Sequence, residues 1–157
     1  MKDYEDGNAP WYPFRTLIKD IDCQDVTYIG NYSFCRSALL AADLPAGLQE
    51  IGIYAFFECD SLEYVYIAEG ITEIGSFAFN RCTDLDAVYC QSREVPLLGN
   101  FVFHNNADAR IIYVPKLSVS DYQHADNWSS YDAFIKARYG TSGGIDWEFG
   151  SGELTIK

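Results

Sequence analysis

The sequence lacks several features that would place it at once in a large class of proteins. No apolar run approaches the roughly eighteen residues that a membrane-spanning helix needs. The N-terminus has no apolar signal region. If the protein is exported, we expect its signal to lie outside this sequence; taken alone, the absence suits a cytosolic protein equally. Basic residues are few, 11 against 23 acidic ones, and the resulting net charge of −12 disfavours binding to nucleic acid or to an anionic membrane surface.

Residues that carry catalysis or hold metals are also scarce. The two histidines, His104 and His124, lie in neither a zinc-protease helix motif nor a serine-hydrolase elbow. There is no Cys-x-x-Cys pair, and Asp84 and Asp86 lack the spacing of a calcium loop. We therefore predict a non-catalytic protein without cofactor or metal, in which both histidines are surface or cap residues.

What the sequence does contain is an apolar and aromatic repeat. The dipeptide Ile-Gly recurs at Ile29, Ile51 and Ile74, with spacings of 22 and 23 residues. A Phe follows five residues after each Ile, a Cys lies three residues beyond two of these Phe residues, and an apolar strand pattern comes next. The matching positions are Phe34, Phe56 and Phe79; Cys59 and Cys82; and the strand positions Leu39, Ala42, Leu44, then Leu62, Val65, Ile67, then Leu85, Val88, Cys90.

The pattern extends in both directions. A first strand position precedes Ile29, and a last one follows a degenerate repeat that contains Gly99 and Phe103. Their inward residues are Ile18, Ile21 and Cys23, and Ala109, Ile112 and Val114. Because matching positions in successive coils stack in register, we predict a solenoid of about 4–5 coils. It has a parallel sheet on one face and short helical or irregular segments on the other.

Two segments, residues 51–59 and 74–82, resemble the BspA-like leucine-rich repeats, an α/β-type solenoid family. The resemblance covers residues 18–115. Ser37 and Asn106 depart from it, since each stands where the family has Cys. Ala68 and Gln91 likewise replace the proline that ends each strand.

The resemblance also implies a domain organisation. It gives an N-terminal cap over residues 1–17, the solenoid over 18–115, a C-terminal cap over 116–139, and a linker plus β-hairpin tail over 140–157. In the cap, a short helical stretch begins at Ser120-Asp121, and three aromatic residues are expected to cover the last coil: Trp128, Tyr131 and Phe134.

The tail has the alternation of a hairpin, with a turn over residues 150–152. Its alternating apolar residues are Ile145, Trp147, Phe149, Leu154 and Ile156. In the family such a pair usually precedes the N-terminal cap, so we expect the hairpin to belong to a following unit of a longer tandem chain. It either stays undocked or mediates head-to-tail self-association by docking on the N-terminal cap of a neighbouring molecule.

One row of residues is expected to face outward on the sheet, at spacings of 21, 23, 23 and 24. It runs Asp22, Asp43, Tyr66, Tyr89 and Tyr113. Exposed neighbouring tyrosines are typical of a recognition surface. The alternative is that they only stabilise the parallel strands as same-face pairs. The neighbouring outward row is predicted to be Asp20, Ala41, Tyr64, Ala87 and Ile111.

The five cysteines have a structural interpretation as small buried hydrophobes in core positions. Cys23 and Cys90 occupy inward strand positions, and Cys59 and Cys82 occupy the repeat's own core position. The alternative is a disulfide between Cys59 and Cys82, which the spacing of adjacent coils allows. Because the count is odd, at least one thiol stays free in either case.

The resemblance implies a binding or adhesion segment of a larger bacterial cell-surface protein, located outside the cell. Its expected partners are a host or bacterial surface protein and, second, a glycan. A passive spacer or display module is the alternative, and a hydrolase is the third hypothesis. The candidate ligand-binding residues are Tyr64, Tyr66, Tyr89, Tyr113, Asp22 and Asp43.

Overall fold

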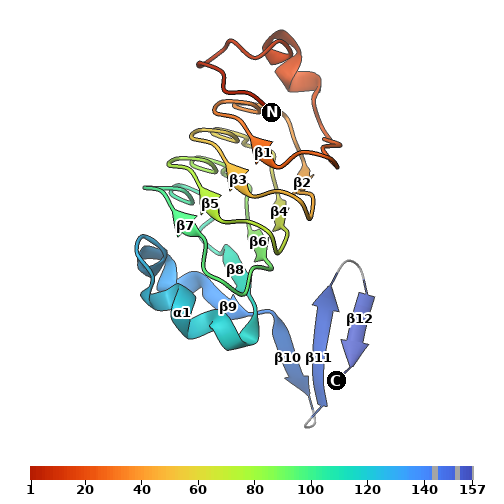
Figure 1. Cartoon of the computed structure of the whole chain (residues 1–157), viewed down its shortest axis with the longest axis vertical. Coiled ribbons are helices and arrows are strands. Elements are labelled where there is room, and N and C mark those ends of the chain that lie inside the picture. Colours follow the sequence, from red (N-terminus) through yellow and green to blue (C-terminus); the bar gives the residue numbers. More distant parts are fainter. Residues whose placement is uncertain (143–144, 151–152, 157) are drawn as a thin grey trace.

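The computed structural model describes residues 1–142, 145–150 and 153–156, and its repeats form a solenoid with two parallel sheets (Figure 1). The larger sheet has five strands in the order β2-β4-β6-β8-β9, and the smaller has four in the order β1-β3-β5-β7. The strands of the larger sheet are β2 (Ala41–Asp43), β4 (Tyr64–Ile67), β6 (Ala87–Cys90), β8 (Ile111–Val114) and β9 (Ile135–Ala137). Those of the smaller sheet are β1 (Tyr28–Ile29), β3 (Glu50–Ile51), β5 (Glu73–Ile74) and β7 (Leu97–Leu98).

The predicted register of the larger sheet is confirmed. Val65 pairs with Val88 and Val88 with Ile112, each on a neighbouring parallel strand. These three side chains are fully buried, because alternate strand residues point to the same face and matching coils place them in one column. The solenoid core therefore comes directly from the repeat.

The first predicted strand, over residues 18–23, is wrong. This segment is irregular, although Leu40 N donates a hydrogen bond to the Lys19 carbonyl at 3.3 Å. The Asp20 carboxylate accepts a bond from the backbone N–H of Ile21 at 2.8 Å. Such a local bond competes with strand pairing. Only Cys23 of the three expected inward residues is buried.

The fifth strand comes instead from the C-terminal cap. β9 pairs with β8 in parallel, with Ile112 opposite Ile135 and Tyr113 opposite Lys136. The last repeat also departs from the prediction at Ala109, which is exposed. The chain turns there, and Arg110 N donates to the Ala107 carbonyl at 3.1 Å.

The smaller sheet was not predicted, and the Ile-Gly dipeptides build it. Ile29 pairs with Ile51, Ile51 with Ile74, and Ile74 with Leu98. The glycine that follows each of them lies against the backbone of the preceding coil. A Cβ on Gly75 would lie 2.7 Å from the Gly52 carbonyl carbon. Glycine is therefore required by the close approach of the coils.

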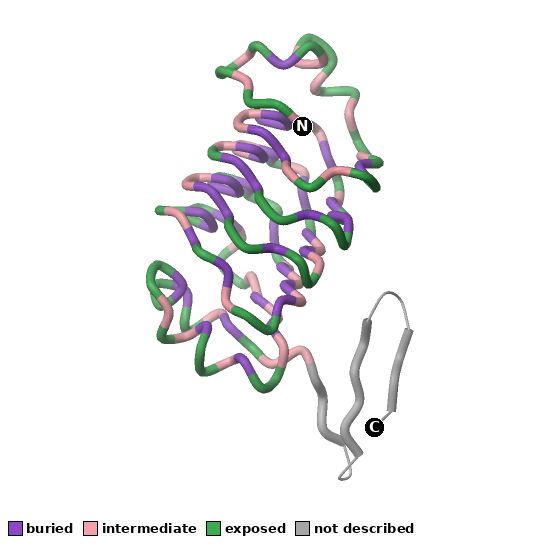
Figure 2. The backbone as a smooth tube through the Cα atoms, viewed as in Figure 1, coloured by how far each residue is buried: buried purple, intermediate pink, exposed green. Residues whose placement is uncertain are grey.

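A column of stacked phenylalanine rings lies in the hydrophobic core. Figure 2 shows that buried segments recur in each successive coil. Successive rings are 5.0–5.7 Å apart with interplanar angles of 5–20°. The column consists of Phe34, Phe56, Phe79 and Phe103. Trp11 stacks on its first ring at 5.9 Å, and Trp128 and Tyr131 pack on its last at 6.0 and 5.6 Å. Both caps therefore close the column with aromatic side chains.

The cysteine position of the repeat supplies a hydrogen-bond donor. Cys59 Sγ contacts the Phe34 carbonyl, and Cys82 Sγ contacts the Phe56 carbonyl, both at 3.1 Å. In the next coil Asn106 Nδ2 donates to the Phe79 carbonyl at 2.8 Å. Asn106, which stands where the family has Cys, therefore supplies the same kind of hydrogen-bond donor as the thiols of Cys59 and Cys82. Ser37, in the first coil, is buried and its hydroxyl has no partner, which fits a coil with no complete repeat before it.

All five cysteines are buried and free, so the alternative of a Cys59–Cys82 disulfide is wrong for this structure. Burial raises the pKa of the Cys35 thiol to about 12 and also raises the pKa of Cys90. A raised pKa keeps a thiol protonated and therefore slow to react. Their role in the fold is that of small core side chains.

The N-terminal cap lies along the first coil. The terminal amine donates to the Tyr28 carbonyl at 2.8 Å, and Tyr4 N donates to the Asn31 carbonyl at 3.0 Å. The 3-10 helix η1 (Tyr12–Leu17) follows. These contacts occupy the edge of β1 that would otherwise be open, which limits strand addition from another chain.

The C-terminal cap contains the expected short helix. It comprises η2 (Lys116–Ser118), α1 (Val119–His124) and η3 (Trp128–Phe134). Trp128 is fully buried, and its indole N–H donates to the Pro96 carbonyl at 2.8 Å. Phe134 is only half-buried and packs under the Arg110 guanidinium at 4.1 Å. Both histidines are exposed, as predicted.

The C-terminal segment forms a separate three-stranded antiparallel sheet of β10 (Tyr139–Ser142), β11 (Ile145–Gly150) and β12 (Glu153–Ile156). The β11–β12 pair is the predicted hairpin. β10 takes residues that were expected to be a linker. The predicted turn falls partly on residues 151–152, which lie outside the described residues, and docking of this hairpin stays a prediction. In the described part of the chain, no helix is long and apolar enough to cross a membrane.

Candidate binding surface

The outward face of the larger sheet carries the tyrosine row, defined here as Tyr66, Tyr89 and Tyr113. β4, β6 and β8 position them, since Tyr66 pairs with Tyr89 and Tyr89 with Tyr113 in the strand register. Each side chain faces outward because its neighbours along the strand are the buried core residues. The structure thus brings these three predicted residues together on neighbouring strands.

The rings of the tyrosine row stack on one another. Tyr89 and Tyr113 are 5.0 Å apart between centroids with an interplanar angle of 7°, and Tyr66 and Tyr89 are 6.2 Å apart and tilted by 36°. All three are half-buried rather than exposed. The row therefore presents ring edges and hydroxyl groups, not open ring faces.

Arg138, just after β9, contacts the far end of the row. Its Nη2 donates to the Tyr66 hydroxyl at 3.1 Å, and its guanidinium lies 5.4 Å from the Tyr66 ring centroid. Arg138 N also donates to the Val114 carbonyl at 2.9 Å. A cation over an aromatic ring is attracted by the ring's electron density, so this contact stiffens the Tyr66 side chain.

Burial raises the pKa of Tyr89, and the neighbouring Tyr113 and Asp86 raise it further. The hydroxyl therefore stays protonated at neutral pH and can both donate and accept a hydrogen bond. Tyr89 therefore combines a hydroxyl that can contact a polar group with an apolar ring.

The neighbouring outward column is also confirmed from its second member onward. Ala41 pairs with Tyr64, Tyr64 with Ala87, and Ala87 with Ile111. Tyr64 is 38% exposed, more than any ring of the tyrosine row. Because its neighbours on both sides are alanines, Tyr64 stands above the sheet and adds contact area beside the row.

The two acidic residues predicted for the row do not lie side by side. Asp43, on β2, pairs with Tyr66 and is exposed at the first position of the row. Asp22 lies in the irregular segment, where no strand places it beside Asp43. The last position is Lys136 on β9, opposite Tyr113. Lys136 was not predicted for the row, because residues 116–139 were expected to form the C-terminal cap.

A second aromatic column, also missed, lies on the turns that follow each Ile-Gly. Its rings are 4.9–5.5 Å apart, and each residue has a positive φ of 55–60°. The column consists of Tyr32, Tyr54, Phe77 and Phe101. The signal was available, since each of these residues stands two positions after the glycine of its repeat, or after Gly99 in the last.

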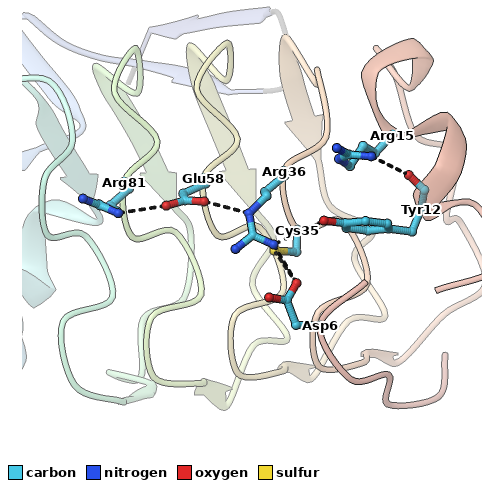
Figure 3. A network of polar contacts seen from close by, with 7 residues as sticks. All are labelled: Asp6, Tyr12, Arg15, Cys35, Arg36, Glu58 and Arg81. Atoms are coloured by element: carbon cyan, nitrogen blue, oxygen red, sulfur yellow. Dashed lines mark hydrogen bonds and ion pairs between the residues drawn. The ribbon is translucent and has the colours of Figure 1, made fainter. Parts of the chain in front are cut away.

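The same turns carry a chain of ion pairs, shown in Figure 3. Arg36 contacts Asp6 at 2.7 Å and Glu58 at 2.8 Å, and Glu58 also contacts Arg81 at 2.9 Å. These ion pairs connect the N-terminal cap to the first three coils. Half-exposed pairs of this kind contribute about 0–1 kcal/mol each.

Beside these ion pairs lies an open surface hollow lined by Glu58, Asp60, Arg81, Thr83 and Asn105. Burial raises the pKa of Asp60, and Glu58 and Asp84 add to the shift. Glu58 is held by two arginines, so the hollow has no free carboxylate pair of the kind that glycoside hydrolysis requires. Among the described residues, no group of three or more His, Cys, Asp or Glu side chains is placed to hold a metal ion.

These features match a known class of repeat. The family model for the BspA type leucine rich repeat region matches residues 15–126 in six copies, and the chain belongs to this family. The match extends beyond the 18–115 expected for the solenoid at both ends. No curated protein matches the chain. Membership makes the chain a protein-interaction or repeat module of a generally non-catalytic class.

Proposed function

We propose that this chain binds a protein partner through the outward face of the larger sheet, as an adhesion segment of a larger bacterial cell-surface protein. The observation that carries the proposal is the tyrosine row, with Tyr66, Tyr89 and Tyr113 aligned on neighbouring strands. Tyrosine combines a large apolar ring with a hydroxyl and is enriched where interfaces derive their binding energy. Tyr64, at 38% exposed, extends the same surface.

The stacking geometry favours a protein over a glycan. A sugar ring binds to an aromatic side chain by covering one of its flat faces. In this row Tyr89 lies between Tyr66 and Tyr113, at 6.2 and 5.0 Å, so its two faces meet neighbours. Ring edges and hydroxyls suit the backbone and side chains of a protein, because they combine apolar contact with hydrogen bonding.

Location outside the cell is part of the same proposal and is supported by family membership together with the acidic surface. The free thiols do not oppose it, since all five are buried, and the raised pKa values of Cys35 and Cys90 slow the oxidation of these two. The head-to-tail self-association expected of residues 145–157 also stays a proposal.

The test uses the whole chain, labelled and applied to an array of immobilised host extracellular proteins and to a glycan array. The double variant Tyr89→Ala/Tyr113→Ala should lose the protein signal while remaining folded. Tyr54→Ala is the matched control, because Tyr54 also stacks between two rings at 4.9 Å but lies on the turn side. Unchanged binding in the double variant would leave the row as strand stabilisation and put the binding surface elsewhere, and no signal of the parent chain on either array would favour a passive spacer.

A further inference from the structure

The outward row that contains the three tyrosines has opposite charges at its two ends. Asp43 on β2 occupies the first position and Lys136 on β9 the last, and both are exposed. The strand register fixes this order, since each residue of the row pairs with the next one. In a chain with a net charge of −12, a lysine at the end of an aromatic row stands out from its surroundings.

The length of the row sets the length of a peptide segment that can lie along it. Five neighbouring strands are separated by four gaps of about 4.8 Å, so Asp43 and Lys136 are roughly 19 Å apart. An extended chain that rises about 3.3 Å per residue covers this distance in about six residues. A short segment can therefore reach both charges while it crosses the three tyrosines.

The middle of the row suits an apolar segment with exposed backbone groups. Tyr89 and Tyr113 offer ring edges and hydroxyl groups. Arg138 lies over the Tyr66 ring and already donates to the Tyr66 hydroxyl. It is therefore part of the binding surface itself.

We propose that the row binds an extended segment of another protein, about six residues long, with a basic side chain at the Asp43 end, apolar or aromatic residues over the tyrosines, and an acidic side chain at the Lys136 end. This inference rests on the proposed function and adds to it the chemistry of the partner. The end charges set how the segment lies, because complementary charges steer an interface and like charges penalise the wrong arrangement.

The probe is a displayed library of random twelve-residue peptides, selected against the whole chain. The binders kept for analysis are those that lose binding to Tyr89→Ala/Tyr113→Ala and retain it on Tyr54→Ala. They should carry one acidic and one basic residue separated by about five positions, with apolar residues between. Lys136→Glu should weaken them about tenfold, since an attraction becomes a repulsion. Lys2→Glu, which changes the net charge equally but lies in the N-terminal cap over the Tyr4 ring, should not.

The double variant Asp43→Lys/Lys136→Glu provides the sharpest result, because it exchanges the two ends without altering the net charge. A peptide held by complementary ends can turn around, so affinity lost in Lys136→Glu should return in the exchanged protein. Row-dependent peptides without the acid–base pair, or a loss that is not recovered, would overturn this inference and leave the proposed function standing. A library with no row-dependent binder would overturn both.

Discussion

The phenylalanine column in the core and the tyrosine row on the sheet face follow the same coil spacing but meet different surroundings. Phe56, Phe79 and Phe103 are fully buried and stack at 5.0–5.7 Å. Tyr89 and Tyr113 stack at 5.0 Å with one edge toward solvent. The repeat therefore produces both of these ladders, and burial distinguishes the inner one, which lies within the core, from the outer one, which stays partly exposed.

The largest loss of stability is expected from interrupting the inner ladder, the phenylalanine column. Phe79→Ala removes a ring between Phe56 and Phe103 and leaves a cavity that a stacked solenoid cannot close, so the free energy of unfolding should fall by about 3–5 kcal/mol. Chemical denaturation followed by circular dichroism measures it. A loss below about 1 kcal/mol, the range of an exposed pair, would remove the distinction between the two ladders.

A smaller loss of stability is expected at Asn106, the hydrogen-bond donor beside the phenylalanine column. Asn106→Ala leaves the buried Phe79 carbonyl without the amide of Asn106, its hydrogen-bond donor, and the free energy of unfolding should fall by about 1–3 kcal/mol. Asn106→Cys is the matched control, because a thiol already serves the equivalent carbonyl in two other coils. If both variants lose the same stability in thermal unfolding, the position contributes packing and not hydrogen bonding.

The outer ladder should contribute less to stability than to binding. Tyr89→Ala loses two same-face ring contacts, each worth about 0.2–1 kcal/mol, and creates no buried cavity. Its free energy of unfolding should therefore fall far less than that of Phe79→Ala in the same denaturation experiment. A loss of comparable size would show that the outer row is a structural element.

The smallest effect is expected on the turn side. Glu58→Gln removes two ion pairs with half-exposed arginines, each worth about 0–1 kcal/mol, so the free energy of unfolding should fall by at most about 2 kcal/mol. High salt should reduce the difference further, because it screens exposed charges. Melting temperatures of the variant and the parent at low and high salt provide the check, and a difference that persists at high salt would contradict it.

The inner ladder could be predicted from the sequence more completely than the outer row. Phe, Cys and strand positions recur at fixed offsets from Ile-Gly, so the burial of Val65 and Val88 followed from counting. Lys136 could not be found in this way, because β9 has no Ile-Gly and pairs with β8 only through tertiary contact. Asp22 was misplaced for a related reason, since no repeat precedes its segment to hold it in a strand.

Half-burial of the tyrosines is another property that spacing alone does not reveal. Counting shows that Tyr66, Tyr89 and Tyr113 point outward, but only the coordinates show how closely the rings stack and that Arg138 reaches Tyr66. The turn-side column, in contrast, was present in the sequence at a constant offset from glycine. This column could therefore have been predicted from the sequence.

The tryptophans that close the phenylalanine column at its two ends give each end its own optical signal. Trp11 reports on the N-terminal end and Trp128 on the C-terminal end, with Trp147 as the only other indole in the chain. Replacing two of the three with phenylalanine leaves a single emitter at a chosen end. Fluorescence during denaturation would then reveal whether this array of coils melts as one unit or frays from one side, as a quasi-one-dimensional fold is able to do.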